Sequence, residues 1–147
     1  MSAKPETTFI AAIHRGLNPH GPHAEKSHNP YRGGTADVWY SGDKGDLWVE
    51  YKFVQTVTPK SRAVIPDLTQ LQLDWLMSRY EEGRNVAVVL GVGKLGGVIY
   101  RERGWEVPLS GELFLTKMVS RSEISHWILD QTGRRYVRSS ESSGIRR

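Results

Sequence analysis

The stretch GTADVWYSGDKGDLWVEYKFV, residues 34–54, holds two runs rich in β-branched and aromatic residues, VWY and LWVEYKFV, on either side of a polar turn that contains glycine. Such runs predict the two strands of a β-hairpin. The second run carries Glu50 and Lys52 in its middle. Because side chains alternate along a strand, these two side chains point to the same face of the sheet.

Asp37 precedes the first run and faces the second across the hairpin. If the turn centres on residues 43–44, Asp37 lies directly opposite Glu50, whereas a bulge at Gly45 would make the relation diagonal. In either register two carboxylates are neighbours. Like charges opposite one another on a sheet repel, and their burial without compensation is costly.

A hard divalent cation satisfies two carboxylate oxygens well, and Mg²⁺ is commonly held by one or two carboxylates while water and phosphate fill its other positions. The hairpin therefore favours a metal site, at which Lys52 would position a water molecule or stabilise a developing negative charge. The alternative is structural, because a Glu-x-Lys pair on a strand is commonly an exposed ion pair of little energetic value.

Apolar spacing and turn residues predict the remaining elements. We expect a helix at 5–16, a loop at 18–33, a helix within 67–83 ended by Gly83, a buried strand at 85–92, weaker strands at 96–102 and 104–109, and a helix at 120–133 with a capping box of Ser120 and Glu123. Leu68, Leu71, Trp75, Leu76 and Met77 are expected to line one side of the second helix. This order predicts an α/β domain around a small mixed sheet.

The 147 residues suffice for one domain with a core of its own. The net charge is +4, and five arginines and one glutamate at 134–147 account for all of it, which leaves 15 basic and 15 acidic side chains in residues 1–133. We expect residues 1–133 to form the domain and 134–147 a flexible basic tail that contacts phosphate or is merely solvated.

The chain has no cysteine, no apolar leader and no run long enough to span a membrane. A thiolate zinc site and a disulfide framework are therefore excluded. The sequence predicts a soluble, intracellular protein of the cytoplasm, or of the host cytoplasm if a phage encodes it.

With Asp37, twelve intervening residues and then Glu50-Tyr51-Lys52 on a hairpin between two helices, residues 5–92 resemble the PD-(D/E)XK nuclease superfamily. Within it the sequence looks most like small phage and bacterial members of the VRR-NUC and Holliday-junction-resolvase type. Ala36 stands where the superfamily motif has proline, a position without a chemical role. The resemblance implies a single-domain, restriction-endonuclease-like core, with a mixed β-sheet flanked by helices.

The resemblance also implies roles for individual residues. Asp37 and Glu50 would be metal ligands with the backbone carbonyl of Tyr51 as a third, and Lys52 would be the catalytic lysine. Glu6 matches an acidic position on the first helix of many relatives, although an acid also suits the first turn of any helix.

Gln72 matches a glutamine that relatives carry on the helix after the lysine strand. It could instead be an ordinary exposed residue, and Gln70 is a neighbouring rival.

The function implied is that of a Mg²⁺-dependent DNA endonuclease, with Mn²⁺ as a substitute, that hydrolyses phosphodiester bonds in branched or junction DNA. Cutting both strands of a junction needs two sites, which implies a homodimer, with residues 96–115 as the expected contact surface. DNA contacts are expected from Lys60, Arg62, Arg134, Arg135 and Arg138. The alternatives are an inactive nucleic-acid-binding module and a nicking or end-processing nuclease without junction preference.

Two other clusters offer competing interpretations. The histidines at 14, 20, 23 and 28 lie near Glu25 and could hold zinc or form a histidine-based nuclease centre, although their spacing is irregular and exposed loop histidines are the simpler interpretation. The aromatic residues Trp39, Tyr40, Trp48, Tyr51 and Trp75 could form a base-stacking platform. Core packing of the hairpin explains most of these aromatic residues equally well.

Overall fold

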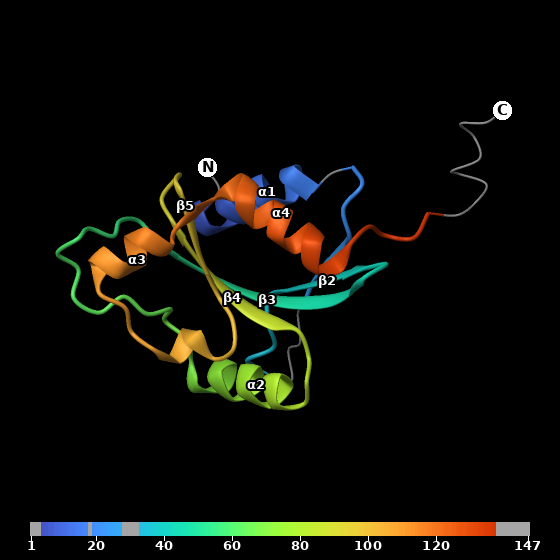
Figure 1. Cartoon of the computed structure of the whole chain (residues 1–147). Helices are drawn as coiled ribbons and strands as arrows, with labels where there is room; N and C mark the ends of the chain where they lie inside the picture. The colour runs from blue at the N-terminus through green and yellow to red at the C-terminus, as the bar shows by residue number, and fades with distance from the viewer. Residues whose placement is uncertain (1–3, 18, 28–32, 138–147) are drawn as a thin grey trace.

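The computed structural model describes residues 4–17, 19–27 and 33–137, which form a six-stranded sheet with helices on both faces (Figure 1). The elements are α1 (Pro5–Leu17), β1 (His23–Lys26), β2 (Val38–Gly42), β3 (Gly45–Val54), α2 (Gln70–Glu81), β4 (Val86–Val92), β5 (Gly96–Tyr100), the 3₁₀ turn η1 (Gly104–Glu106), α3 (Gly111–Lys117), β6 (Val119–Ser120) and α4 (Arg121–Thr132). None of the described helices has the length and apolar character needed to cross a bilayer.

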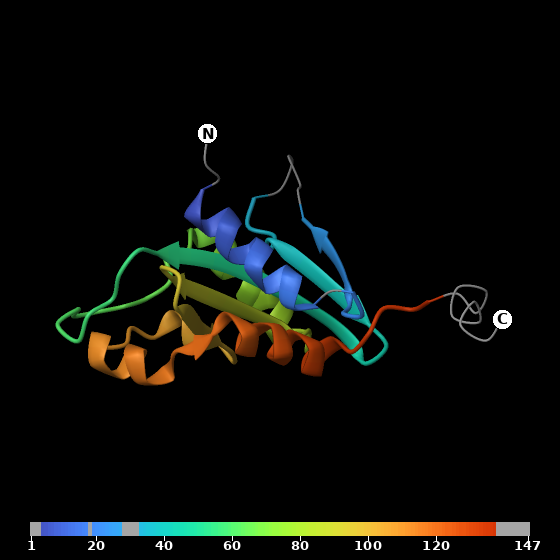
Figure 2. The same cartoon turned by 90° about the horizontal axis from the view of Figure 1, so that it is seen from above.

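The strands lie in the sheet in the order of the sequence, from β1 at one edge to β6 at the other. Only β3 and β4 pair in parallel among the described strands, and the other neighbours are antiparallel. A parallel connection needs a crossover, which α2 provides. Figures 1 and 2 show the result: α1 and α4 lie together on one face of the sheet, and α2 lies on the other.

The face under α1 and α4 holds the first core cluster. The four apolar residues of α1 with helical spacing are all buried, as predicted, at Phe9, Ile10, Ile13 and Leu17. They pack with the odd-numbered residues Leu47, Val49 and Tyr51 of β3 and with Ile124 and Ile128 of α4. Alternation along β3 therefore leaves its even-numbered residues for the opposite face.

The opposite face holds a second core cluster, which includes Leu76 of α2, Trp105 and Phe114. Here the prediction for α2 was partly wrong. Leu76 is fully buried, but Leu71 and Met77 are 58% and 38% exposed. The helix lies within the predicted segment and begins at Gln70, because Thr69 caps it and its side chain accepts a hydrogen bond from the backbone of the third helical residue.

Three segments differ from the sequence-based expectation. The expected loop at 18–33 contains β1, whose four residues are all exposed and which is ordered by pairing with β2 rather than by burial of an apolar face. The expected strand at 104–109 begins as the turn η1, which follows Arg103 in the left-handed region at φ 65°. The short elements α3 and β6 were not predicted, and Gly111 and Phe114 of α3 are buried.

Candidate active site

The register of the hairpin decides how the two acidic residues meet. Val38 pairs with Val49 and Gly42 with Gly45, so the turn consists of residues 43–44. Continued by one residue, this pairing sets Asp37 opposite Glu50. The turn lies where the direct register requires it, no bulge at Gly45 interrupts the ladder, and the ladder ends at Val38, one residue before Asp37.

Asp37 immediately precedes β2, and its side chain is hydrogen-bonded to the neighbouring strand β3. Its Oδ2 accepts a hydrogen bond of 3.0 Å from the backbone N–H of Tyr51. Because the N–H and C=O of one strand residue point to the same side of the strand, the Tyr51 carbonyl is also directed toward the side of Asp37. The phenol of Tyr51 points the other way, into the first core, where its oxygen lies 2.6 Å from that of Tyr40.

Glu50 is the most unusual side chain of the site, because it is an acid with only 2% of its surface exposed. Its Oε2 accepts a hydrogen bond of 3.1 Å from Gln72 Nε2 and lies 4.0 Å from Lys52 Nζ. Its Oε1 is buried and has no hydrogen-bond partner among the described residues. Burial first, and then the charge of Asp37, raises the pKa of Glu50 to about 9.

Gln72 reaches Glu50 from the first turn of α2. Its Oε1 accepts from the backbone N–H of Thr69 at 3.0 Å, which completes a capping box, while its Nε2 donates to Glu50. The side chain of Gln70 turns away from Glu50, and its Nε2 donates to Asp74 Oδ1 at 2.9 Å. The structure therefore brings Gln72, and not Gln70, to the acidic pair.

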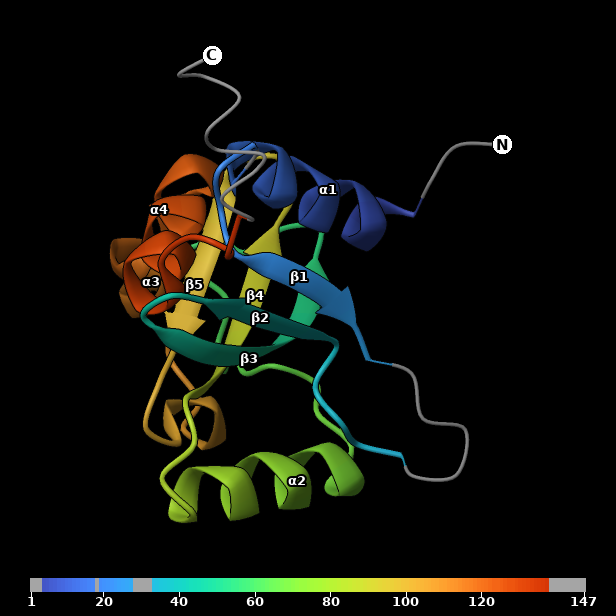
Figure 3. The ribbon, with the colours of Figure 1, turned by 90° about the vertical axis from the view of Figure 1, so that its right-hand side faces the viewer.

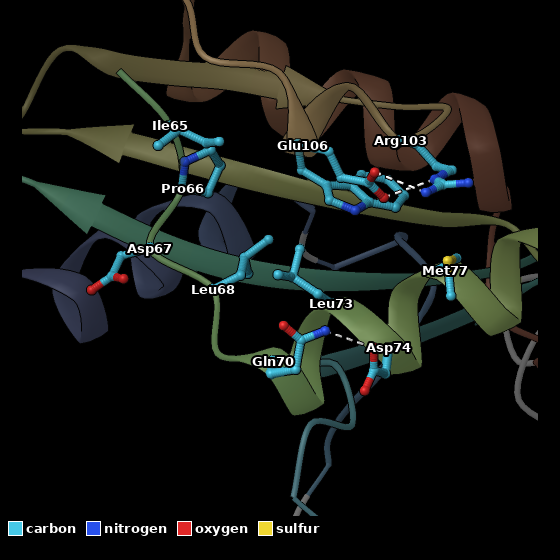
Figure 4. A pocket seen from close by; sticks show the side chains of 11 residues that line it. Ile65, Pro66, Asp67, Leu68, Gln70, Leu73, Asp74, Met77, Arg103 and Glu106 are labelled. Carbon is cyan, nitrogen blue, oxygen red and sulfur yellow. Dashed lines mark hydrogen bonds and ion pairs between the residues drawn. The ribbon is translucent and has the colours of Figure 1, made fainter. Parts of the chain in front are cut away.

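Gln70 belongs instead to a pocket of about 610 Å³ between α2 and the η1 turn (Figure 4). Its lining is apolar at Ile65, Leu73 and Met77, and acidic at Asp67 and Asp74. It includes none of the acidic pair or Lys52. Its one lining cation, Arg103, is paired with Glu81 and Glu106, so the lining offers a phosphate little free positive charge and this pocket is no part of the candidate active site.

Glu6 approaches the pair from the first turn of α1. Partial burial, and next the charge of Asp37, raises the pKa of Glu6, whereas Lys52 acts in the opposite direction. Glu6 and Asp37 line the same pocket, which has a volume of about 280 Å³. Even so, no three His, Cys, Asp or Glu side chains within residues 4–17, 19–27 and 33–137 gather closely enough to hold a metal ion, so Glu6 lies beside the pair rather than joining it.

The same pocket contains two cations that sequence reasoning missed, Lys4 and Lys26. Lys26 is on β1, at the position paired with Val38 next to Asp37. Both lysines can meet phosphate at the rim of the acidic site. The missed signal is the segment HAEK at 23–26, which lacks the glycine and proline of its surroundings and could have been interpreted as a short edge strand.

The cations expected to bind nucleic acid lie apart from the acidic pair. Lys60 and Arg62 are exposed on the loop between β3 and α2, and neither forms an ion pair with another described residue. Arg134 and Arg135 follow α4, at the turn end of the hairpin, where the backbone N–H of Arg134 donates to Asp43 Oδ1 at 3.0 Å. Arg138 lies outside the described residues.

The histidines do not form the alternative site within the described part of the chain. His14 lies 2.8 Å from the Tyr40 hydroxyl, and burial lowers the pKa of its ring. His23 instead contacts Glu25 at 3.3 Å. His28, the fourth histidine of the expected cluster, falls outside the described residues. The three described histidines of this cluster and Glu25 therefore form no zinc site within the described part of the chain.

The donor set at the hairpin suits a hard divalent cation. Asp37 contacts β3 beside Glu50, the Tyr51 carbonyl is directed toward the side of Asp37, and the buried Oε1 of Glu50 lacks the partner that a cation would supply. A set of two carboxylates is what Mg²⁺ uses when water and phosphate complete its shell. A cation would also favour the charged form of Glu50, which the metal-free site disfavours.

Comparison with solved structures shows that this arrangement of elements is a known fold. The chain is similar to the Holliday junction resolvase Hjc of Archaeoglobus fulgidus, an archaeal hyperthermophile, with a TM-score of 0.51 and 13% sequence identity. The likeness covers 82% of this chain and 99% of the resolvase. At this identity the likeness shows the fold, a mixed sheet flanked by helices. No family model and no curated protein matches the sequence.

Proposed function

We propose that this protein is a metal-dependent DNA endonuclease that hydrolyses phosphodiester bonds, with selectivity for branched or junction DNA. The observation that carries the proposal is the buried carboxyl of Glu50 opposite Asp37, with Lys52 and Gln72 directed to the same oxygen. A pKa raised to about 9 means that the charged form of Glu50 is unfavourable in the metal-free protein. Unfavourable pairs of titratable groups are typical of functional sites.

We propose Mg²⁺ as the cofactor, with Mn²⁺ as a substitute, held by Asp37, Glu50 and the carbonyl of Tyr51. When bound, such a cation polarises a phosphate and lowers the pKa of a coordinated water. The protein itself supplies the remaining functions. The Lys52 ammonium, only partly exposed, is placed to donate to the attacking water or to the phosphate oxygens as their negative charge grows.

The other residues act through orientation and charge. Gln72 holds the Glu50 carboxylate from α2, and Glu6 adds negative charge beside Asp37. Lys4 and Lys26 at the rim would bind phosphates that flank the scissile one. Selectivity for junctions is supported by the fold shared with a resolvase, and it implies that two copies of the chain act together.

The purified protein should be incubated with Mg²⁺ or Mn²⁺ and matched linear, nicked, forked and four-way DNA. Cleavage of the branched forms, abolished by EDTA and by Asp37→Ala, is the expected result. Brisk Mg²⁺-dependent cleavage by the Asp37→Ala protein would overturn the catalytic assignment. If the wild-type protein cleaved all four DNA forms equally, the protein would still be a nuclease, but the proposed preference for junctions would be wrong.

A further inference from the structure

A row of aromatic side chains lies on the same face of the sheet as the acidic pair. Trp39 pairs with Trp48 across the hairpin, and their rings lie 5.9 Å apart with a tilt of 30°. Trp75 of α2 continues the row 5.5 Å from Trp48, and His23 of β1 stands edge-on to Trp39 at 6.0 Å. Of the other aromatic residues of the hairpin, Tyr40 and Tyr51 are buried in the first core and Phe53 packs against it.

The members of the row differ in how far packing explains them. Trp48 and Trp75 pack against the second core. Trp39 belongs to neither core cluster and is partly exposed. Its indole Nε1 donates to Asp46 Oδ2 at 3.1 Å, which fixes the ring in place on the surface of the sheet. A fixed, partly exposed indole that belongs to neither core is available to a ligand.

A pocket of about 630 Å³ adjoins Trp39 at the turn end of the hairpin. Its wall includes His23 and Trp39 on the strands, and Arg135 and Tyr136 on the segment after α4. Figures 1 and 2 show this segment leaving α4 beside the β2–β3 turn, and in Figure 3 it lies by β1. The volume lies within the range of small-molecule sites, which is about 300–1,000 Å³.

The segment that closes the pocket is anchored by its backbone. The N–H of Arg135 donates to the Gly21 carbonyl at 3.1 Å, and the N–H of Asp43 donates to the Arg134 carbonyl at 2.8 Å. The side chain of Tyr136 is nonetheless 83% exposed, so it contributes little to packing. An anchored backbone with an exposed aromatic ring and a neighbouring arginine is typical of a binding surface.

The charges of the pocket suit a phosphate-bearing aromatic ligand. Asp46 is engaged by Trp39 Nε1 and by Ser41 Oγ, and Asp43 is engaged by the backbone of Arg134. Arg135 forms no ion pair with another described residue. The ligand groups that match are therefore a planar ring for the aromatic walls and an anion for the arginine.

Strand geometry sets the distance from this pocket to the acidic pair. Trp39 and Ser41 share one face of β2, and Asp37 precedes that strand by one residue, so Trp39 is two and Ser41 four residues from Asp37. At about 3.3 Å per residue, Ser41 lies roughly 13 Å from Asp37. A stacked strand rises about 3.4 Å per nucleotide, so the pocket lies within about four nucleotides of a phosphate at the acidic pair.

We propose that Trp39, Tyr136 and Arg135 bind an unpaired nucleotide of the DNA substrate, with its base stacked on the two aromatic rings and its phosphate at the arginine. This inference rests on the proposed function, because it names the feature of branched DNA that the protein reads: unpaired bases a few nucleotides from the scissile phosphate. Stacking tolerates any base, so the preference is for unpaired structure rather than for sequence.

The test is binding of a fluorescent oligo-dT strand and of a matched duplex to the full chain in EDTA, where no cleavage occurs. Trp39→Ala and Tyr136→Ala should each weaken single-strand binding about 5- to 150-fold. Duplex binding should change less than twofold. Tyr136→Phe, which keeps the ring, should bind the single strand like the wild type, and Leu95→Ala, at an exposed site outside the row, serves as a surface control.

Unchanged single-strand binding in both alanine variants would overturn the proposal, as would an equal loss on duplex DNA. Tyr136→Ala keeps the test valid if Trp39→Ala is poorly folded, because Tyr136 is exposed. The result is independent of catalysis. If the nuclease proposal failed, Trp39-dependent strand binding would persist, and if stacking failed, Asp37-dependent cleavage would persist.

Discussion

Gln72 Nε2 donates to Glu50 Oε2 at 3.1 Å, while the Oε1 of the same amide accepts from the N-cap backbone of α2 at 3.0 Å. One amide therefore joins the start of a helix to the buried acid of a strand 22 residues earlier in the chain. The amide can do both because it contains a donor and an acceptor, whereas a carboxylate at the same position could only accept.

Gln72→Glu should reduce cleavage about 10- to 100-fold, the usual cost of losing a group that orients a metal ligand. A glutamate at this position can still complete the capping box, but it places a third negative charge beside Glu50 and removes the donor. Thr69→Ala is the matched control: it should cost about 1 kcal/mol of stability and leave cleavage unchanged. Cleavage rates and thermal melts of the two variants check this, and equal activity loss in both would contradict it.

Alanine at Asp37, Glu50 or Lys52 should each reduce Mg²⁺-dependent cleavage by several orders of magnitude. Each removes a group directed to the reacting phosphate or to its metal. The variants should still fold and bind DNA, as measured by circular dichroism and gel shift. Asp67→Ala, in the pocket beside α2, should cleave like the wild type. If Lys52→Ala cleaved DNA at the wild-type rate, Lys52 would have no catalytic role.

The sequence predicted the hairpin well because its information is local. Alternation along β3 determines which residues share a face, so the common face of Glu50 and Lys52 followed from spacing, whereas the register between Asp37 and Glu50 stayed open between two alternatives until the turn was seen at residues 43–44. The helix α1 was predicted for the same reason, since its apolar residues recur on one side.

Contacts between segments far apart in the sequence were harder to predict. β1 has four exposed residues and exists because β2 offers an open edge, and the only local sign of it is the absence of glycine and proline from HAEK. Lys26 reaches the site pocket by that pairing and was missed. Leu71 and Met77 have helical spacing but are exposed, because α2 buries only Leu76 fully against the sheet.

The stability of the metal-free protein should fall as the pH rises. Burial raises the pKa of Glu50 from 4.5 to about 9, so between these values the folded protein holds a proton that the unfolded chain has lost. The stabilisation is complete below pH 4.5 and is lost toward pH 9, at up to about 1.4 kcal/mol per pH unit for one proton. Glu50→Gln should melt higher than the wild type at pH 8 in EDTA, with a flatter dependence of Tm on pH.

Added Mg²⁺ provides the control for this prediction. It should raise the Tm of the wild type at pH 8, because it binds the deprotonated carboxylates of the folded state, and it should have little effect on Glu50→Gln. If the variant keeps the wild-type pH dependence, Glu50 is not the titrating group.

Junction cleavage predicts a homodimer, because one domain offers one acidic site and a junction has two strands to cut. Light scattering at micromolar concentration, with and without four-way DNA, measures the mass. Within the expected contact surface at 96–115, Val107 and Leu113 are 57% and 46% exposed. Their replacement by lysine should yield a monomer if this surface is used. A wild-type monomer that stays monomeric on DNA would instead favour a nicking or end-processing nuclease.

The basic end should contribute affinity without selectivity. Deleting residues 138–147 removes three arginines but leaves the anchored segment 134–137 in place. Each phosphate contact contributes about −0.9 to the slope of log K against log salt on duplex DNA, so the truncation should flatten that slope by about two to three units. All DNA forms should be affected alike, and cleavage of saturating substrate should persist, because none of the proposed metal ligands is removed.

Arg135→Ala in the truncated chain should flatten the slope by about one further unit if Arg135 contacts a phosphate. Titrations of binding between low and moderate salt measure both changes, and an unchanged slope after truncation would show that the tail is only solvated.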